Sequence, residues 1–548
     1  MEEKSIILEK AKKEQQLGNY QKSFDLLEQI FDIKDYFAAF EYAKTLYLLK
    51  QYEKAIDIFL ALNEKDKEDR NVIDFIIKSY KENNNIEDLF KFVKTKNLID
   101  TKISLEIAET FFVVKQYKVA INFYEQYVEK NKDDINVVSK LLQLYNFLGY
   151  KQKTIELSDK YLTNSQVRED KFLYNLFLNE QEIAQEKTIL KSNPRIMLIM
   201  LTNKCNLRCP MCATIHQKNQ WEISDEFKQY ILNNLDNLEL ITWQGGEVFL
   251  YKGFKDLFLK AKKNKYLKQI IITNGLLINE QWADLITQAN RLDLTISIDS
   301  IEKDIYEKLR FGANFEQLLQ NLECIKQCRI KNNSNITVTM RTTISDENIY
   351  TLDKIVNFAI NYNINVLIWS PLIMEGNQQY SLKSKSDDDL VVIKANIDNA
   401  LNKAQKNKIK VIYLLEKVED ILNERNKKIE EEETSKQEIS LKQECKSEYK
   451  CSNTEEKDVN LFVTSEKSSL CFRPWKQIAT TVEGKLRPEC LCLQDIGDIH
   501  NCENFEELWN NDFMQEYRIK MVSSNQQWCC DNCKKNIVSE EHKKFTCW

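Results

Sequence analysis

Three cysteines stand within eight positions of one another near the middle of the chain. The stretch runs Thr202-Asn-Lys-Cys205-Asn-Leu-Arg-Cys209-Pro-Met-Cys212 and follows the apolar run 196–201. A structural zinc site normally takes four protein ligands, whereas three thiolates on a [4Fe–4S] cluster leave one iron free for an outside ligand. If the apolar run is a strand, the cysteines occupy the loop at its carboxyl end, where parallel barrels place their chemistry.

The spacing Cys-x3-Cys-x2-Cys resembles that of the radical S-adenosylmethionine (SAM) superfamily. The resemblance implies that Cys205, Cys209 and Cys212 hold a [4Fe–4S] cluster whose open iron chelates SAM. It also implies reductive cleavage of SAM to a 5′-deoxyadenosyl radical, hydrogen abstraction from a substrate, and an electron donor of the flavodoxin or ferredoxin type. The residue before the third Cys is usually aromatic and packs on the adenine; here it is Met211, a polarizable substitute. Half a zinc site and three incidental thiols are the alternatives.

The composition limits the class of protein. The 548 residues are enough for about three or four domains. A net charge of −6 gives no general attraction to nucleic acid or anionic lipid. We find no targeting signal and no apolar run near twenty residues, so we expect a cytoplasmic protein without nucleic-acid or membrane partners. In that compartment fifteen cysteines favour metal ligands over disulfides, and three scattered histidines argue against a His-based mechanism.

Short β-rich runs alternate with helical stretches over residues 194–380. This alternation predicts six parallel strands in a partial (β/α)6 barrel, the fold that the resemblance also implies. The ligand-binding residues should follow the carboxyl ends of the strands. The strands are expected at 195–201, 238–243, 269–273, 292–298, 336–343 and 365–370.

Further motifs of the same family follow these strands in order. Gly245-Gly246-Glu247, after the second strand, resembles the Gly-Gly-Glu that contacts the SAM amino group, and paired glycines allow a close backbone approach to a ligand. Ser297 and Asp299, at the end of the fourth, match the Ser-x-Asp that binds the ribose hydroxyls. Arg341, on the fifth, is a candidate partner of the SAM carboxylate.

Two of three further segments leave more than one interpretation open. Thr273-Asn274-Gly275 is either a ligand loop or merely a tight turn. Arg310 in the sequence Arg310-Phe-Gly312 resembles the Arg-x-Gly turn of the family; it either neutralises an anion or caps its helix at the surface. Met374-Glu-Gly376-Asn377 stands where the last SAM contacts are expected.

A second group of cysteines lies near the end of the chain and resembles the SPASM/twitch region that follows many radical SAM cores. The resembling features are Cys471 before Pro474-Trp475, a cysteine after the hairpin Gly484, and a late Cys-x2-Cys. The resemblance implies one auxiliary [4Fe–4S] cluster, although four thiolates also suit zinc. Its implied ligands are Cys471, Cys490, Cys530 and Cys533, with Cys492 and Cys529 as competitors. Cys445 and Cys451 are expected to be incidental.

The sequence pattern of the N-terminal third predicts an array of helix pairs. Polar breaks recur about every 31 to 34 residues, at 18–20, 50–52, 85–86, 115–117 and 148–150. Small residues (Ser23, Ala55 and Ala120) follow three of these breaks. The pattern resembles tetratricopeptide (TPR) repeats, which would stack as a solenoid that either binds a peptide or protein partner or braces the rest of the chain.

We therefore expect five segments: an all-α TPR-like solenoid (1–165), a helical connector (166–193), the partial barrel (194–380), a charged spacer containing helix–strand–helix at 389–424 (381–466), and a small Cys-rich auxiliary-cluster domain (467–548). The leading hypothesis is a radical SAM enzyme that modifies a peptide or protein. The alternatives are a radical SAM enzyme for a sugar or nucleotide precursor, and a non-catalytic scaffold with structural clusters.

Overall fold

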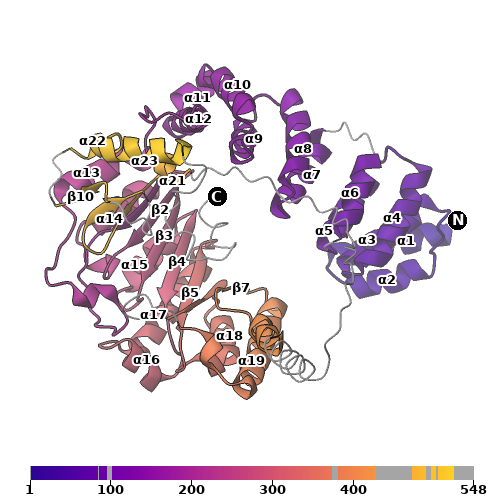
Figure 1. Ribbon diagram of the computed structural model, residues 1–548. Helices are drawn as coiled ribbons and strands as arrows, with labels where there is room; N and C mark the ends of the chain where they lie inside the picture. The colour runs from indigo at the N-terminus through magenta and orange to yellow at the C-terminus, as the bar shows by residue number, and fades with distance from the viewer. Residues whose placement is uncertain are drawn as a thin grey trace, which may run out of the picture. The chain divides into compact units, whose positions relative to one another are not determined.

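The computed structural model describes residues 2–83, 85–95, 101–372, 380–427, 472–488, 495–500 and 504–523. The chain forms two compact units, Met1–Leu148 and Gly149–Trp548. Most of their helices and several of their strands are labelled in Figure 1.

In its described residues the first unit consists of helices joined by short turns. Successive helices pack as pairs, α1 with α2, α3 with α4, and α7 with α8. The helical N-terminal region predicted from the sequence is therefore confirmed. The helices are α1 (Glu2–Gln16), α2 (Tyr20–Glu28), α3 (Tyr36–Leu48), α4 (Tyr52–Lys65), α5 (Arg70–Glu82), α6 (Ile86–Thr95), α7 (Thr101–Val113), α8 (Tyr117–Lys130) and α9 (Ile135–Phe147).

The repeat period is visible in the backbone. Gly18, Lys50, Lys115 and Gly149 each have a positive φ, between 62° and 79°, and each stands two residues before the next helix begins. Gly18 and Lys50 are 32 residues apart, and Lys115 and Gly149 are 34 apart. Lys50 and Lys115 are separated by about two such periods, as the predicted breaks are. The small residues Ser23, Ala55 and Ala120 are fully buried, as close helix packing requires. Glycine adopts this conformation without strain, whereas lysine does not.

Replacing the lysine at one of these turns should stabilise the first unit. We expect Lys50→Gly to raise its stability by about 1 kcal/mol, because the left-handed strain of Lys50 is removed, and Gly18→Ala to lower it by a similar amount. Calorimetry of the full chain would measure the shift in the melting temperature. Lys44→Gly, inside helix α3, is the control and should lower the stability of the first unit. Equal effects of Lys50→Gly and Lys44→Gly would contradict the assignment of strain to Lys50.

The second unit is organised around one mostly parallel sheet. The strand order is β10-β9-β8-β1-β2-β3-β4-β5-β6-β7, and every neighbouring pair from β8 to β7 is parallel. Only the short hairpin strands β9 and β10 pair antiparallel. The strands are β1 (Ile196–Met200), β2 (Leu240–Gln244), β3 (Lys268–Thr273), β4 (Leu292–Ser297), β5 (Thr337–Ile344), β6 (Val366–Pro371), β7 (Lys410–Tyr413), β8 (Gln477–Thr480), β9 (Lys485–Arg487) and β10 (Gly497–Asp498).

The described helices of this unit surround the sheet. Those that follow β1 to β6 lie along one face of it (Figure 1). Several begin at a Ser or Asn cap, such as Ser224, Asn279 and Asn314, whose side chain accepts a bond from the first turn. The helices are α10 (Lys151–Leu162), α11 (Ser165–Glu169), α12 (Lys171–Ala184), α13 (Asp225–Asn234), α14 (Phe254–Ala261), α15 (Glu280–Thr287), α16 (Lys303–Leu309), α17 (Phe315–Lys331), α18 (Leu352–Asn361), α19 (Asp387–Lys406), α21 (Arg473–Lys476), α22 (Phe505–Leu508) and α23 (Asp512–Ser523).

The two faces of the sheet differ in composition. Side chains facing the helices are apolar and buried, among them Ile241, Trp243 and Trp369. Alternate residues on β4 and β5 are polar or partly exposed, and Ser297 pairs in register with Arg341. Because residues two apart along a strand share a face, Ser297 and Arg341 lie together on the face away from the helices.

All six predicted strands are present, with boundaries that shift by one or two residues. The predicted helix–strand–helix at 389–424 also forms, as α19, β7 and a helix over 418–427. We had assigned it to the spacer, but β7 pairs with β6 and extends the barrel sheet. The apolar positions of α19, including Leu390 and Ile393, are buried in the barrel core.

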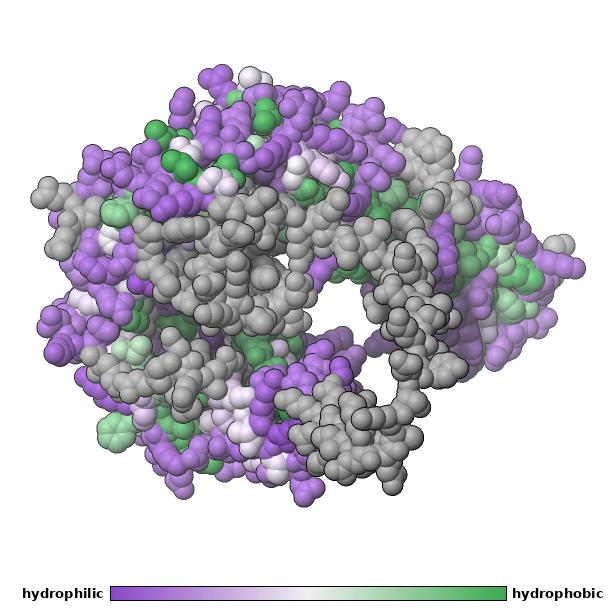
Figure 2. Space-filling view, viewed as in Figure 1, coloured by the Kyte–Doolittle hydropathy of each residue, from purple (hydrophilic) through white to green (hydrophobic). Residues whose placement is uncertain are grey.

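The outer surface is dominated by hydrophilic residues, and hydrophobic ones form small separated groups on the face shown in Figure 2. None of the helices in the described ranges is both long and apolar enough to cross a lipid bilayer.

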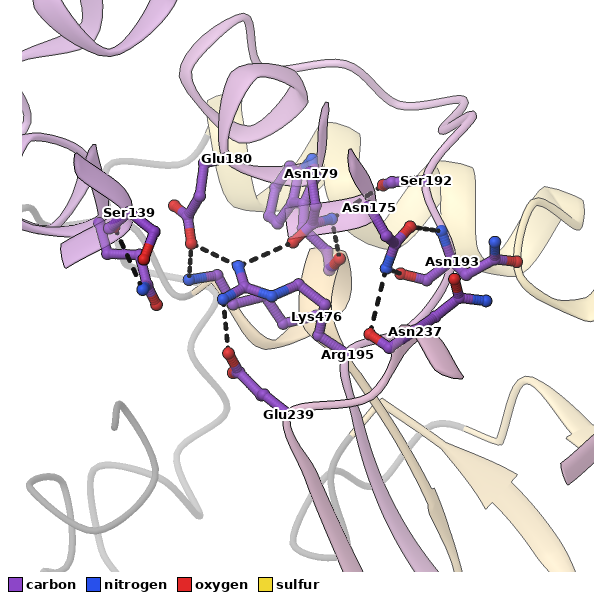
Figure 3. A network of polar contacts seen from close by, with 12 residues as sticks. Ser139, Asn175, Asn179, Glu180, Ser192, Asn193, Arg195, Asn237, Glu239 and Lys476 are labelled. Carbon is purple, nitrogen blue, oxygen red and sulfur yellow. Dashed lines mark hydrogen bonds and ion pairs between the residues drawn. The ribbon is translucent and has the colours of Figure 1, made fainter. Parts of the chain in front are cut away.

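A buried ion network fixes the amino end of β1. The guanidinium of Arg195 has no exposed surface and pairs with Glu180 of α12 and, at 2.5 Å, with Glu239 before β2. Lys476 of α21 also contacts Glu180, at 2.7 Å. Figure 3 shows Glu180 between the two cations and Asn179 beside them. Burial alone would raise the pKa of Glu180, but the charges of Lys476 and Arg195 outweigh it and lower the pKa.

We expect Glu180→Gln to destabilise the second unit by about 3 kcal/mol at neutral pH, since it leaves buried cations short of a partner. Because the pKa of Glu180 is lowered, its contribution to the free energy of unfolding is complete at pH values above the ordinary carboxyl pKa of 4.5. This contribution is lost as the pH falls below that value. The difference in stability between wild type and Glu180→Gln should therefore become smaller in acid. Calorimetry at pH values from 7 downward would measure it. Glu424→Gln, which breaks an exposed pair with Lys383, is the control and should change little.

Candidate active site at the carboxyl ends of the strands

The three cysteines of the central motif lie in the loop that follows β1. Cys209 is 8% exposed, and Cys205 and Cys212 are half-buried. The backbone N–H of Cys212 donates to the carbonyl of Cys209 at 2.9 Å, which closes a turn between them. The structure thus places all three thiols at the carboxyl end of the first barrel strand, as predicted.

Two thiols of this loop, those of Cys205 and Cys209, are poor anions without a bound cation. Burial raises the pKa of Cys209 to about 11; Arg310 opposes the shift, and the neighbouring thiols add to it. Burial also raises the pKa of Cys205. Metal ligation requires thiolates, which are negatively charged. A bound metal group supplies the positive charge that stabilises them. The donor set fits an iron–sulfur cluster or another soft metal group. In the described ranges no three His, Cys, Asp or Glu side chains surround one point closely enough to hold a single ion.

The predicted Gly-Gly-Glu segment holds the cysteine loop in place. The N–H of Gly246 donates to the carbonyl of Thr202, and the N–H of Glu247 donates to that of Lys204, both at 2.8 Å. A Cβ on Gly246 would stand 2.3 Å from the carbonyl oxygen of Lys204, and one on Gly245 would stand 2.5 Å from that of Thr202. The structure therefore explains both glycines by close contact between two loops of the chain itself.

Glu247 is buried, and protein donors occupy its carboxylate. Thr273 Oγ1 donates to Oε1 at 2.8 Å, and the N–H of Asn274 donates to Oε2 at 2.9 Å. Burial raises the pKa of Glu247, and these hydrogen bonds oppose the shift. Through Glu247 the loop after β2 is tied to the loop after β3.

The Thr273-Asn274-Gly275 segment is more than a tight turn. Asn274 is buried, and its Nδ2 donates to Asn206 Oδ1 at 2.8 Å and lies 4.0 Å from the sulfur of Cys205. Sequence reasoning left its role open, and its place after a strand was the only signal. The structure adds Asn274 to the residues around the cysteine loop.

Asp299 and Arg310 form a buried ion pair beside the cysteine loop. Asp299 has no exposed surface; its Oδ2 accepts from Arg310 Nε at 2.8 Å and its Oδ1 accepts from the N–H of Thr343 at 2.8 Å. The next residue, Phe311, accepts a backbone bond from Arg208 in the cysteine loop. Arg310 is thus neither a surface residue nor a simple helix cap, because its charge is held near Cys209.

Arg341 lies on β5, next to Ser297 of β4 in the strand register. Arg341 as a residue is exposed, but desolvation lowers the pKa of its guanidinium; Asp299 opposes the shift and Arg310 adds to it. No described residue forms a hydrogen bond or ion pair with it. Arg341 is therefore a cation available to an anionic ligand on the face that carries Ser297.

Several predicted residues lie outside the described residues: Met374–Asn377, Cys445, Cys451, Cys471, Cys490, Cys492, Cys529, Cys530 and Cys533. Two described tryptophans, one near Cys471 and one in contact with the β8–β9 hairpin, donate hydrogen bonds to backbone carbonyls. Trp475 is buried, and its Nε1 donates to the carbonyl of Lys187 at 2.7 Å. Trp221, just beyond the cysteine loop, donates to the carbonyl of Val482 in the β8–β9 hairpin at 3.0 Å. The hairpin thus contacts the segment that follows the cysteines.

Several known proteins are similar to parts of this chain. Residues 199–359 match the Radical SAM superfamily. GTP 3′,8-cyclase from Synechocystis is 28% identical over 185 residues, which are 32% of this chain and 56% of that protein. A serine-type anaerobic sulfatase-maturating enzyme from Bacteroides thetaiotaomicron is 26% identical over 153 residues, 24% of this chain and 37% of that protein. The crystal structure of Streptococcus suis SuiB bound to S-adenosylmethionine has a TM-score of 0.43 and 13% identity, over 69% of this chain and 83% of that one.

Residues 199–359 therefore match a radical SAM domain. The family implies a [4Fe–4S] cluster and SAM, as expected from the cysteine spacing. The chain spans little more than half the length of the first relatives that it matches.

Substitution of Gly246 tests how the cysteine loop is held. We expect Gly246→Ala to weaken retention of metal by about 10- to 100-fold, because the added methyl displaces the backbone that carries Cys205. Iron per chain would be measured after anaerobic reconstitution and challenge with a chelator. Gly253→Ala is the control, since Gly253 has an ordinary φ of −78° and a Cβ there would meet the side chain of Tyr251 and not the backbone of the cysteine loop. Equal iron retention in both variants would contradict the account.

Proposed function

We propose that this protein reductively cleaves SAM to a 5′-deoxyadenosyl radical, which abstracts a hydrogen from a peptide or protein substrate. The proposal depends on one observation above all: Cys205, Cys209 and Cys212 share one loop at the carboxyl end of β1, inside a domain that matches the Radical SAM superfamily. Three thiolates leave one iron of a cubane open to a further ligand.

The proposed residue roles follow from the placement of the side chains. When bound, the cluster would supply the single electron that breaks a carbon–sulfur bond of SAM, and the protein would position the reactants. Cys205, Cys209 and Cys212 would hold the cluster. The proposed SAM contacts are Met211, Gly245, Gly246, Glu247, Ser297, Asp299 and Arg341.

Two cations support binding of the SAM carboxylate or of another anion. Arg341 is exposed, and none of the described residues pairs with it, so it is available to a ligand. Arg310 is already held by Asp299 at 2.8 Å. In this arrangement Asp299 acts chiefly by fixing Arg310, and the half-buried Ser297 is better placed to bind a ribose hydroxyl.

A peptide or protein substrate is supported by two features. One relative is named a sulfatase-maturating enzyme, so its target is a protein. The helical pairs of the first unit, which resemble TPR repeats, offer the kind of surface that binds extended peptides. The second candidate is a small molecule, supported by the similarity to GTP 3′,8-cyclase.

The C-terminal cysteines complete the proposal. We assign Cys471, Cys490, Cys530 and Cys533 to one auxiliary [4Fe–4S] cluster, on their resemblance to the SPASM/twitch pattern. A flavodoxin- or ferredoxin-type protein would supply electrons. A non-catalytic scaffold is the remaining alternative, and an intact three-cysteine loop argues against it.

The first experiment is anaerobic reconstitution with iron and sulfide, followed by dithionite and SAM. We expect 5′-deoxyadenosine from wild type and none from the Cys205→Ala, Cys209→Ala, Cys212→Ala triple variant. Iron should fall from roughly eight to about four per chain in the variant, because only the auxiliary cubane would remain. Mass spectrometry and iron analysis give the two readouts.

A Cys324→Ala, Cys328→Ala double variant is the matched control, since these two thiols lie on helix α17. It should keep both iron and deoxyadenosine. Deoxyadenosine from the triple variant, or none from iron-loaded wild type, would contradict the proposal. Consumption of added GTP together with deoxyadenosine formation would favour the small-molecule candidate.

A further inference from the structure

The cysteine loop forms part of the molecular surface. Buried and exposed residues alternate along it: Leu207 is 2% exposed and Cys209 is 8% exposed, whereas Asn206, Arg208 and Pro210 are exposed. The backbone that carries the thiols therefore faces the interior with one set of side chains and the solvent with the other. A partner protein that contacts the exposed set would stand next to the residues proposed to hold the cluster.

Arg208 carries a positive charge that the described residues do not neutralise. Its Nη1 donates to the backbone carbonyls of Cys205 and Leu207, both at 3.1 Å, and no described carboxylate forms an ion pair with it. By contrast, Lys303 and Lys308 of the neighbouring helix α16 each pair with a glutamate, at 2.6 and 2.7 Å. The two carbonyls hold the guanidinium of Arg208 on the loop and leave its charge available to a partner.

An exposed aromatic ring lies on the turn that contacts this loop. Phe311 is 64% exposed, the largest fraction among the Phe, Tyr and Trp residues described in the second unit. The N–H of Arg208 donates to the carbonyl of Phe311 at 2.9 Å, and a Cβ on Gly312 would stand 3.7 Å from the carbonyl oxygen of Asn206. The backbones that carry the cation and the ring are thus in direct contact.

The composition of this surface fits a particular kind of partner. A single exposed ring is ordinary on a protein surface, but arginine and aromatic side chains together are enriched in the residues that dominate binding. Transient electron-transfer complexes use small interfaces, and a positive charge guides an acidic partner to its site. A carrier bound at Arg208 would be one residue along the chain from Cys209, so the electron would have to cross only the loop.

We propose that Arg208 and Phe311 form the docking surface for a small acidic electron-carrier protein, which reduces the cluster across the cysteine loop. The proposal depends on the cluster site of the proposed function. In this step the carrier loses one electron and the cluster gains it, with no transfer of a proton or a chemical group. Arg208 supplies the charge that orients the carrier, and Phe311 supplies the apolar contact.

The test compares carrier proteins with dithionite, a small ion that needs no docking surface. Full-length reconstituted protein would be titrated by calorimetry with a flavodoxin and with a ferredoxin, and 5′-deoxyadenosine would then be measured with either reduced carrier or with dithionite. We expect Phe311→Ser to weaken carrier binding about tenfold and to slow carrier-driven SAM cleavage by a similar factor. Dithionite-driven cleavage should stay at the wild-type rate.

Arg208→Gln is the second variant and tests the charge. It should weaken carrier binding by a similar factor, and the remaining binding should depend less on salt concentration than that of wild type, because one screened charge interaction has been removed. Calorimetry at two salt concentrations would measure this difference.

Ile330→Ser and Arg291→Gln are the matched controls. Ile330 of helix α17 is also 64% exposed, and Arg291 is an exposed arginine that stands directly before β4. Both lie toward the amino ends of the strands, away from the cysteines, and both variants should bind the carrier as wild type does.

Carrier binding at the wild-type level in both Phe311→Ser and Arg208→Gln would overturn the inference, as would binding of neither carrier to wild type. An equal fall in carrier-driven and dithionite-driven cleavage in Phe311→Ser would also overturn it and would assign the surface to the substrate. These results leave the proposed function intact as long as wild type cleaves SAM with dithionite. Its failure to do so would contradict the proposed function itself.

Discussion

The pairing of Arg195 with Glu180 is the constraint on which the second unit depends. A guanidinium and a carboxylate without exposed surface are tolerable only because each has a charged partner, and those partners come from separate parts of the chain. The network joins α12, the start of β1, the entry to β2 and the C-terminal segment at Lys476. Strand β1 is thereby fixed at its amino end, and the cysteines follow its other end. Any movement of this junction would be transmitted along five residues of strand to the thiols.

The carboxyl end of β1 is held in a different way. Backbone groups of Gly246 and Glu247 bond to the cysteine loop there, and Asn274 contacts the same loop from the next strand. Rigid backbone contacts keep the loop ordered while leaving two of its thiols accessible. The two ends of β1 are therefore held differently, by a buried ion network at the amino end and chiefly by backbone hydrogen bonds between loops at the carboxyl end.

Much of the fold was predictable from the sequence, because the strands and the cysteine loop are local patterns. The six strands and the order of the motifs follow from short apolar runs and their spacing. Long-range pairing could not be read in this way. Lys410–Tyr413 looked like an isolated strand in a polar spacer, since nothing in four residues indicates that they extend a sheet. Likewise Asp299 and Arg310 were separate candidates in the sequence, and only the fold shows that they bind each other. The repeat period could be predicted because Gly18 and Lys50 mark the same turn, whereas the role of Asn274 depends on neighbours distant in the chain.

The parallel pairing of β1 with β8 also has a consequence for biogenesis. Met200 and Thr480, which bond across this pair, are 280 residues apart. At ordinary rates of translation, on the order of tens of seconds pass before β8 exists to cover the edge of β1. During that interval an apolar strand next to three reactive thiols has one unpaired side, the kind of edge that invites aggregation. Newly made chains thus need protection until the C-terminus is complete, and insertion of metal belongs after release from the ribosome.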